Sequence, residues 1–137
     1  MFERYTEKAR RTIFFARYEA SHLGGSYIET EHILLGLLRE DKAIVLRCLP
    51  AIRADEIRSK VDAHSTRSPK LPTSADLPLS NECKRVLAHA AEEAERLAHR
   101  HIGSEHLLLG LLREEAGYAA QLLRQYGVEL ATLRAGN

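Results

Sequence analysis

The sequence predicts an all-α protein built from two copies of one four-helix unit. A thirteen-residue block at 28–40 returns at 102–114 with ten identities, a constant offset of 74 positions. Apolar residues ahead of both blocks recur at the spacing of one helix face, and three of the four prolines gather at 65–79, between the copies. A duplicated unit of this length folds as two copies of one substructure. We therefore expect two four-helix repeats, related by a pseudo-twofold axis and joined by an extended linker.

The first helix of each repeat is predicted from an apolar stripe behind a hydroxyl residue. Apolar or small side chains recur every three or four positions after Thr6, which predicts a helix over about 7–22 with Thr6 as its N-cap. The stripe returns over 83–97 behind Ser80, which takes the place of Thr6 as the cap.

The second helix of each repeat is the repeated block itself, expected at about 31–40 and 105–115. Thr30 and Ser104 are predicted to cap these helices, because a hydroxyl there can accept from free first-turn amides.

Apolar residues occupy every face of these second helices, which predicts that each helix lies in the middle of its repeat. Gly36 and Gly110 each cost about 1 kcal/mol of helix propensity relative to alanine. A neighbouring helix is therefore expected to cross closely at both glycines.

Shorter third and fourth helices complete each copy, at 43–49 and 55–64 in the first and at 118–125 and 129–135 in the second. We expect one domain over 1–137, with repeat one at about 1–64, the linker at 65–79 and repeat two at about 80–137. Each half of about 65 residues would be marginally stable alone.

Composition excludes several classes of protein. The 137 residues carry 20 basic and 19 acidic side chains, a net charge of +1 that gives no bias toward nucleic acid. The start lacks the apolar core of a signal peptide, and the longest apolar run, 33–38, is too short to cross a membrane. Cys48 and Cys83 show no CxxC spacing, which argues against zinc and disulfides. We expect a soluble protein of the reducing cytoplasm.

The sequence contains no recognisable catalytic or metal-binding motif. The position four residues after His32 is Gly36, so the paired histidines of a helical zinc motif are absent. We expect His32 and His106 to be partly buried first-turn residues, and His99 and His101 to lie in a solvated loop. Phosphate-loop and nucleophile-elbow motifs are also missing. We therefore predict no enzyme activity, no cofactor and no metal.

A binding role is predicted at the start of the second helix in each repeat. Unpaired backbone amides and the helix dipole favour an anion there, and Glu31 or Glu105 places a carboxylate beside them. Such a site suits a ligand with both charges. Ordinary helix capping explains the same residues without any ligand.

Two segments and their duplication resemble a known family. Thr-Glu-His-Ile-Leu-Leu-Gly-Leu-Leu-Arg-Glu at 30–40 and Met-Phe-Glu-Arg-Tyr-Thr-Glu-Lys-Ala-Arg-Arg at 1–11 closely resemble the amino-terminal repeat domain of Clp chaperone ATPases, especially the ClpC type. The resemblance covers essentially the whole chain. It implies a compact helical module that receives protein substrates or adaptor proteins for the Clp ATPase and protease machinery.

The resemblance also implies a ligand and its contacts. ClpC-type domains recognise phosphoarginine with the acid of the Thr-Glu-His motif, which corresponds to Glu31 and Glu105 here, and Thr30 and Ser104 could add hydroxyl donors. The family usually has glycine before this motif. Repeat one has Glu29, which should repel a phosphate, so repeat two is expected to be the better site.

Residues near the first cap offer a second candidate surface. Phe2 and Tyr5, with Arg10 and Arg11, resemble the aromatic and basic surface through which such domains meet adaptors. Phe2 could equally be a staple for the first helix. Two alternatives stay open: a free-standing factor that docks onto Clp ATPase or protease rings without reading substrate, and a phosphoarginine hydrolase that uses His32 or His106.

Overall fold

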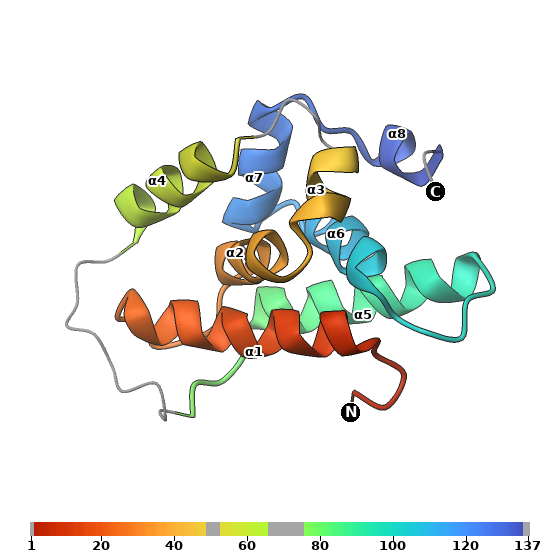
Figure 1. Cartoon of the computed structure of the whole chain (residues 1–137), viewed down its shortest axis with the longest axis horizontal. Coiled ribbons are helices and arrows are strands. Elements are labelled where there is room, and N and C mark those ends of the chain that lie inside the picture. The colour runs from red at the N-terminus through yellow and green to blue at the C-terminus, as the bar shows by residue number, and fades with distance from the viewer. Residues whose placement is uncertain (1, 49–52, 66–75, 136–137) are drawn as a thin grey trace.

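The computed structural model describes residues 2–48, 53–65 and 76–135, which fold into two sets of four helices (Figure 1). Repeat one comprises α1 (Glu7–His22), α2 (Thr30–Glu40), α3 (Lys42–Cys48) and α4 (Ala54–His64). Repeat two comprises α5 (Asn81–Arg96), α6 (Ser104–Arg113), α7 (Tyr118–Gln125) and α8 (Leu130–Ala135). The predicted fold class is confirmed. Most of the predicted extended linker, 66–75, lies outside the described residues.

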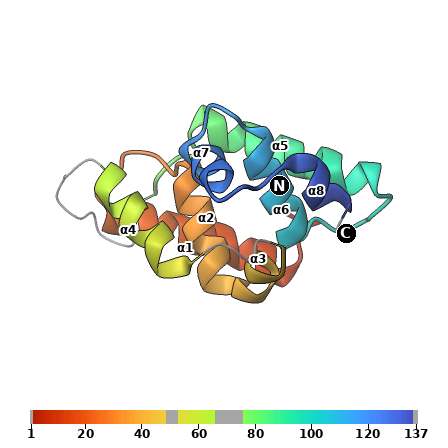
Figure 2. The ribbon, with the colours of Figure 1, turned by 90° about the horizontal axis from the view of Figure 1, so that it is seen from above.

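The two repeats are arranged about an approximate twofold axis. Helices α1 and α5 run in opposite directions along one side of the molecule, and α2 and α6 lie over them (Figure 1). Seen from above, α4 lies toward one end of the molecule and α8 toward the other, with α1 and α5 on opposite sides of α2 and α6 (Figure 2). The starts of α2 and α6 therefore occupy corresponding places in the two halves.

Hydroxyl caps begin the two long helices, as the sequence predicts. Thr6 Oγ1 accepts a hydrogen bond from the Ala9 amide at 3.1 Å, and Ser80 Oγ accepts one from the Cys83 amide at 3.1 Å. Each cap satisfies one of the first-turn amides that a helix leaves unpaired.

Helices α2 and α6 are the most buried elements, which confirms the prediction from their apolar faces. Every residue of α2 from Thr30 to Leu38 is buried. A Cβ on Gly36 would collide with the carbonyl oxygen of Thr12 in α1, and one on Gly110 would lie 2.5 Å from the carbonyl oxygen of Val86 in α5. The close crossings expected at both glycines are therefore present.

Two short backbone pairings join the repeats reciprocally. Tyr5 pairs with Ile102, and Ile28 pairs with Leu79 in the same parallel sense. Moving 74 positions forward from Tyr5 gives Leu79, and moving 74 positions back from Ile102 gives Ile28, so the two pairings exchange the roles of the repeats. The segment entering the first helix of each repeat thus lies against the loop before the second helix of the other repeat. Neither half makes these bonds alone.

Ion pairs repeat with the same offset. Arg11 pairs with Glu40 and Arg85 with Glu114, in each case joining the first helix of a repeat to the end of its second. None of the described helices has the length and apolar character needed to cross a bilayer.

Candidate functional site

The helices that carry the repeated block begin one residue earlier than the sequence suggests. Their N-caps are Glu29 and Gly103, so Thr30 and Ser104 are the first helical residues. The prediction that these two hydroxyls cap α2 and α6 is therefore wrong. A histidine serves the helix start instead: Nδ1 of His32 accepts from the Glu29 amide at 2.9 Å, and Nδ1 of His106 accepts from the Gly103 amide at 2.9 Å.

These bonds fix the form of both imidazoles. Because Nδ1 is the acceptor, a neutral ring carries its proton on Nε2. Burial lowers the pKa of His32 to about 4, and burial is also the main cause that lowers the pKa of His106. Both rings are therefore neutral at pH 7. They are the hydrogen-bonded first-turn residues that the sequence predicts.

The two hydroxyls of the motif differ in their partners. Thr30 Oγ1 accepts from the Ala119 amide at 3.2 Å in the first turn of α7, and it donates weakly to Glu31 at 3.5 Å. Thr30 thus caps a helix of the opposite repeat. Ser104 Oγ is buried without any hydrogen-bond partner in the described part of the chain. Neither hydroxyl faces open solvent, and their predicted contact with a ligand stays a prediction.

Glu31 lies between two cavities. The larger, of about 410 Å³, is bounded by Glu29, Glu31 and His32 at the start of α2, the loop 23–27 and the end of α4. The smaller, of about 250 Å³, is also bordered by Glu29, Glu31 and His64 and reaches Glu82 and the start of α7. Burial, with the nearby Glu29 charge as a lesser cause, raises the pKa of Glu31. Although Glu31 is only 8% exposed, it borders space that a ligand could fill.

Glu105 takes a different position. Its side chain is 27% exposed, and a Cβ on Gly103 would collide with its carboxylate. Glu105 therefore folds back over the glycine that begins α6. The corresponding residue in repeat one, Glu29, has a Cβ in that place, so Glu31 cannot fold back in the same way.

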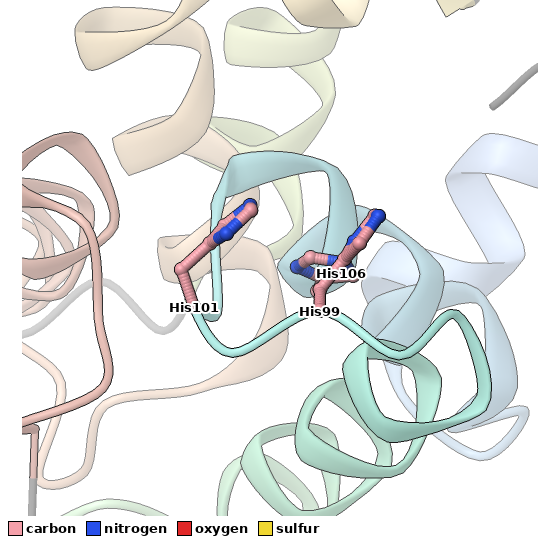
Figure 3. Close-up of side chains that lie close together, drawn as sticks. All are labelled: His99, His101 and His106. Carbon is pink, nitrogen blue, oxygen red and sulfur yellow. The ribbon is translucent and has the colours of Figure 1, made fainter.

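Three histidines gather in front of α6 (Figure 3). His99 and His101 come from the loop and His106 from the first turn of the helix, and their ligand atoms all lie within 4.8 Å of one another. His99 Nδ1 lies 2.9 Å from His106 Nε2. The rings of His99 and His101 stack at 5.1 Å. The sequence predicts a solvated loop here and gives no sign that the fold joins His106 to the pair.

The hydrogen bonds of the cluster oppose metal binding. Nδ1 of His106 already accepts from Gly103, so Nε2 holds the proton that it donates to His99. A metal at Nε2 would displace that proton and leave Nδ1 without the outward N–H that ligating histidines normally donate. The residues present suit a hydrogen-bonded chain better than a ligand set.

The predicted aromatic and basic surface divides into different environments. Phe2 is half-buried and packs edge-on against Tyr5 at 4.9 Å. Tyr5 is 7% exposed, and burial raises its pKa to about 12. Arg11 is held by Glu7 and Glu40, whereas Arg10 is exposed. Beside Tyr5, a cavity of about 400 Å³ runs along α5 and is lined mainly by apolar side chains.

Comparison with known proteins identifies the family of this chain. The family model for the Clp repeat (R) N-terminal domain matches residues 4–126. The chain belongs to this family. The predicted resemblance to ClpC-type domains is confirmed as well, because chaperone protein ClpC1, chloroplastic, of Arabidopsis thaliana is 42% identical over 136 residues, 98% of this chain. The ClpA homolog of Porphyra purpurea, an ATP-binding subunit of ATP-dependent Clp protease, is 39% identical over 137 residues, also 98% of this chain.

The chain spans only 14% and 17% of the length of these two relatives. Among solved structures, the N-terminal domain of ClpD from Arabidopsis thaliana is 30% identical with a TM-score of 0.78, covering 98% of this chain and 92% of that one. The Hsp104 N-terminal domain from Candida albicans shares the fold at 20% identity and a TM-score of 0.74, covering 97% and 88%. The cytoplasmic location stays a prediction, and the ClpC1 relative is chloroplastic by name.

Proposed function

We propose that this domain is a noncatalytic module that binds protein substrates or adaptor proteins for a Clp ATPase and protease system, and that it recognises phosphoarginine at the start of α6. Membership in the Clp repeat family supports the first part. The relatives are named as chaperones and as ATP-binding subunits of a Clp protease. The second part rests on the surroundings of Glu105.

The observation that carries the proposal is an acid at the start of α6 without an arginine or lysine partner among the described residues. Glu105 is partly exposed beside the loop that carries His101, and its one ion-pair contact within 4 Å among the described residues is with His106, whose ring is neutral. Arg4 reaches the same loop by donating to the Arg100 carbonyl at 3.0 Å. A guanidinium can bind the carboxylate, while the first-turn amides and the basic side chains face the phosphate.

Gly103 gives this site its freedom to open. The carboxylate of Glu105 lies over the glycine, where it screens the amides of the first turn. Rotation of Glu105 outward exposes those amides and presents the acid to the ligand. Thr30 caps α7 and the Ser104 hydroxyl is buried, so neither is needed as a ligand contact, and Glu31 belongs to a site of different charge.

Titration with free phosphoarginine, followed by amide NMR, tests this proposal. We expect saturable shifts around 101–106 and at least a tenfold loss of affinity in Glu105→Gln, because a charge-assisted hydrogen bond contributes about 1.5–3 kcal/mol. Glu115→Gln, at a side chain that is 80% exposed, is the matched control and should bind normally. Unmoved amides around 101–106 would refute phosphoarginine recognition.

A docking role without substrate is the second candidate. The apolar cavity beside Tyr5 and α5 could receive a segment of a Clp ring or an adaptor. Binding to purified Clp ATPase or protease in the absence of any phosphorylated protein would favour this role. Loss of that binding in Leu87→Glu, but not in Glu105→Gln, would show that the docking takes place at this cavity.

A further inference from the structure

We propose that the cavity beside Glu31 binds the guanidinium of an unmodified arginine side chain, so that the two repeats recognise different forms of one residue. The claim for repeat one stands on the geometry of α2. Only the contrast with repeat two rests on the proposed function.

Charge excludes a phosphate from this cavity. Glu29 and Glu31 border the larger space, and Glu82 joins them at the smaller one. No lysine or arginine lines either cavity among the described residues. A phosphorylated arginine carries about two negative charges on its phosphate at neutral pH, which these carboxylates would repel. An unmodified guanidinium carries one positive charge and is attracted.

Glu31 is a buried acid that a bound cation would stabilise. Its side chain is more than nine-tenths buried, yet its only hydrogen bond from another described side chain is the 3.5 Å contact with Thr30. His64 is the one side chain whose charge favours the ionised form, and without an arginine or lysine partner a buried carboxylate is costly to keep ionised. The second acid, Glu29, lets a planar guanidinium bind across two carboxylates.

His32 supplies a directed donor for the rest of the ligand. The residue is 4% exposed and borders the larger cavity, and its Nδ1 is held by the Glu29 amide. Its Nε2–H has no partner among the described residues. This donor suits a backbone carbonyl next to the bound arginine, whereas a free guanidinium has no acceptor to offer it.

Aromatic rings favour arginine over lysine. Tyr27, which is 51% exposed, and His64 both line the cavity. His64 is already stacked against Tyr118 at 3.6 Å, so its ring is held in place. A guanidinium stacks on such rings while it binds carboxylates in its plane, which the compact ammonium of lysine cannot do.

In repeat two a side chain occupies the corresponding space beside His106. At the position of Gly25, whose Cβ would lie 3.5 Å from the His32 ring, repeat two carries His99. The imidazole of His99 fills that place and takes the hydrogen bond of His106. The glycine in repeat one thus leaves room that a ligand can enter.

Amide NMR with three probes tests the proposal on the whole chain: N-acetyl-arginine amide, N-acetyl-lysine amide and phosphoarginine. We expect the arginine amide to shift amides 25–32 saturably, with at least tenfold weaker binding of the other two probes there. Glu31→Gln should weaken the arginine amide roughly tenfold, in line with one charge-assisted hydrogen bond. Glu115→Gln should not change it.

A second variant separates binding from folding. Gly25→His copies the residue of repeat two and should abolish arginine binding while the melting temperature stays near that of the wild type. Unmoved amides 25–32, or equal affinity for the lysine or phosphoarginine probe, would overturn the proposal. If phosphoarginine fails at 101–106 while the arginine amide still binds at 25–32, the proposed function falls and this inference survives.

Discussion

The starts of α2 and α6 share a sequence motif and the histidine bond to the N-cap amide, but they differ in the contacts of their glutamates and hydroxyls. Glu31 is buried between cavities with Glu29 beside it, whereas Glu105 is partly exposed and folds over Gly103. Thr30 caps a helix of the other repeat, whereas Ser104 has no described partner. The scaffold of a duplicated unit can thus stay the same while its two surfaces acquire different charge.

The largest expected effect is a loss of stability in acid, which comes from the buried histidine at the start of α2. The pKa of His32 is about 4 when folded, against an ordinary value of 6.5. The unfolded chain therefore binds more protons between these values, and stability falls as the pH drops through that window. We expect a loss of about 3 kcal/mol from His32 alone between pH 7 and pH 4.

NMR titration of the His32 ring, with urea unfolding at each pH, measures this effect. An imidazole that titrates near pH 6.5 in the folded protein would contradict the account of the helix start.

The two helix crossings should be equally sensitive to added volume. Gly36→Ala forces a methyl group against the Thr12 carbonyl, and Gly110→Ala forces one against the Val86 carbonyl. Each should lower the free energy of unfolding by about 2 kcal/mol, after the gain in helix propensity is deducted. Urea unfolding of both variants tests it. A stabilised variant would mean that the crossing helices separate readily.

Removal of the Thr30 and Ser104 hydroxyls should have different effects on stability. Thr30→Val leaves the Ala119 amide buried without its acceptor and should cost about 1–2 kcal/mol. Ser104→Ala removes a hydroxyl that has no described partner, so stability should stay the same or rise slightly. Thermal unfolding of the two variants side by side measures the difference. Equal losses would mean that Ser104 has a partner as important as that of Thr30.

A glutamate at the N-cap of α6 should make the start of α6 resemble the start of α2 and weaken its binding of phosphoarginine. Gly103→Glu places a Cβ where the Glu105 carboxylate lies and adds a negative charge. We expect roughly tenfold weaker phosphoarginine binding, about 1.4 kcal/mol, with little change in the melting temperature. Calorimetry of the variant beside the wild type provides the measurement. Unchanged affinity would show that the glycine does not determine the preference for phosphate.

Local patterns explain what the sequence could predict. The hydroxyl caps at Thr6 and Ser80 act within three residues of themselves, and the glycines of α2 and α6 stand out in otherwise apolar helices. Spacing alone carries such information. The helices therefore follow from the sequence closely.

Contacts between distant segments explain what the sequence could not predict. The acceptor role of Thr30 depends on Ala119, 89 positions away, so its hydroxyl looked like a cap for its own helix. The histidine cluster exists because the loop before α6 folds back over the first turn. Cavities depend on what neighbouring elements leave unfilled, and the glycine at 25 reveals one only after its place beside His32 is known.

The number of phosphoarginine molecules bound per chain tests the central claim most directly. The account assigns the phosphate-bearing ligand to the start of α6 and excludes it from the acidic cavity beside α2. Isothermal titration calorimetry of the wild type should therefore give one site per chain, lost in Glu105→Gln and kept in Glu31→Gln. Two equivalent sites, or one site that depends on Glu31, would contradict it.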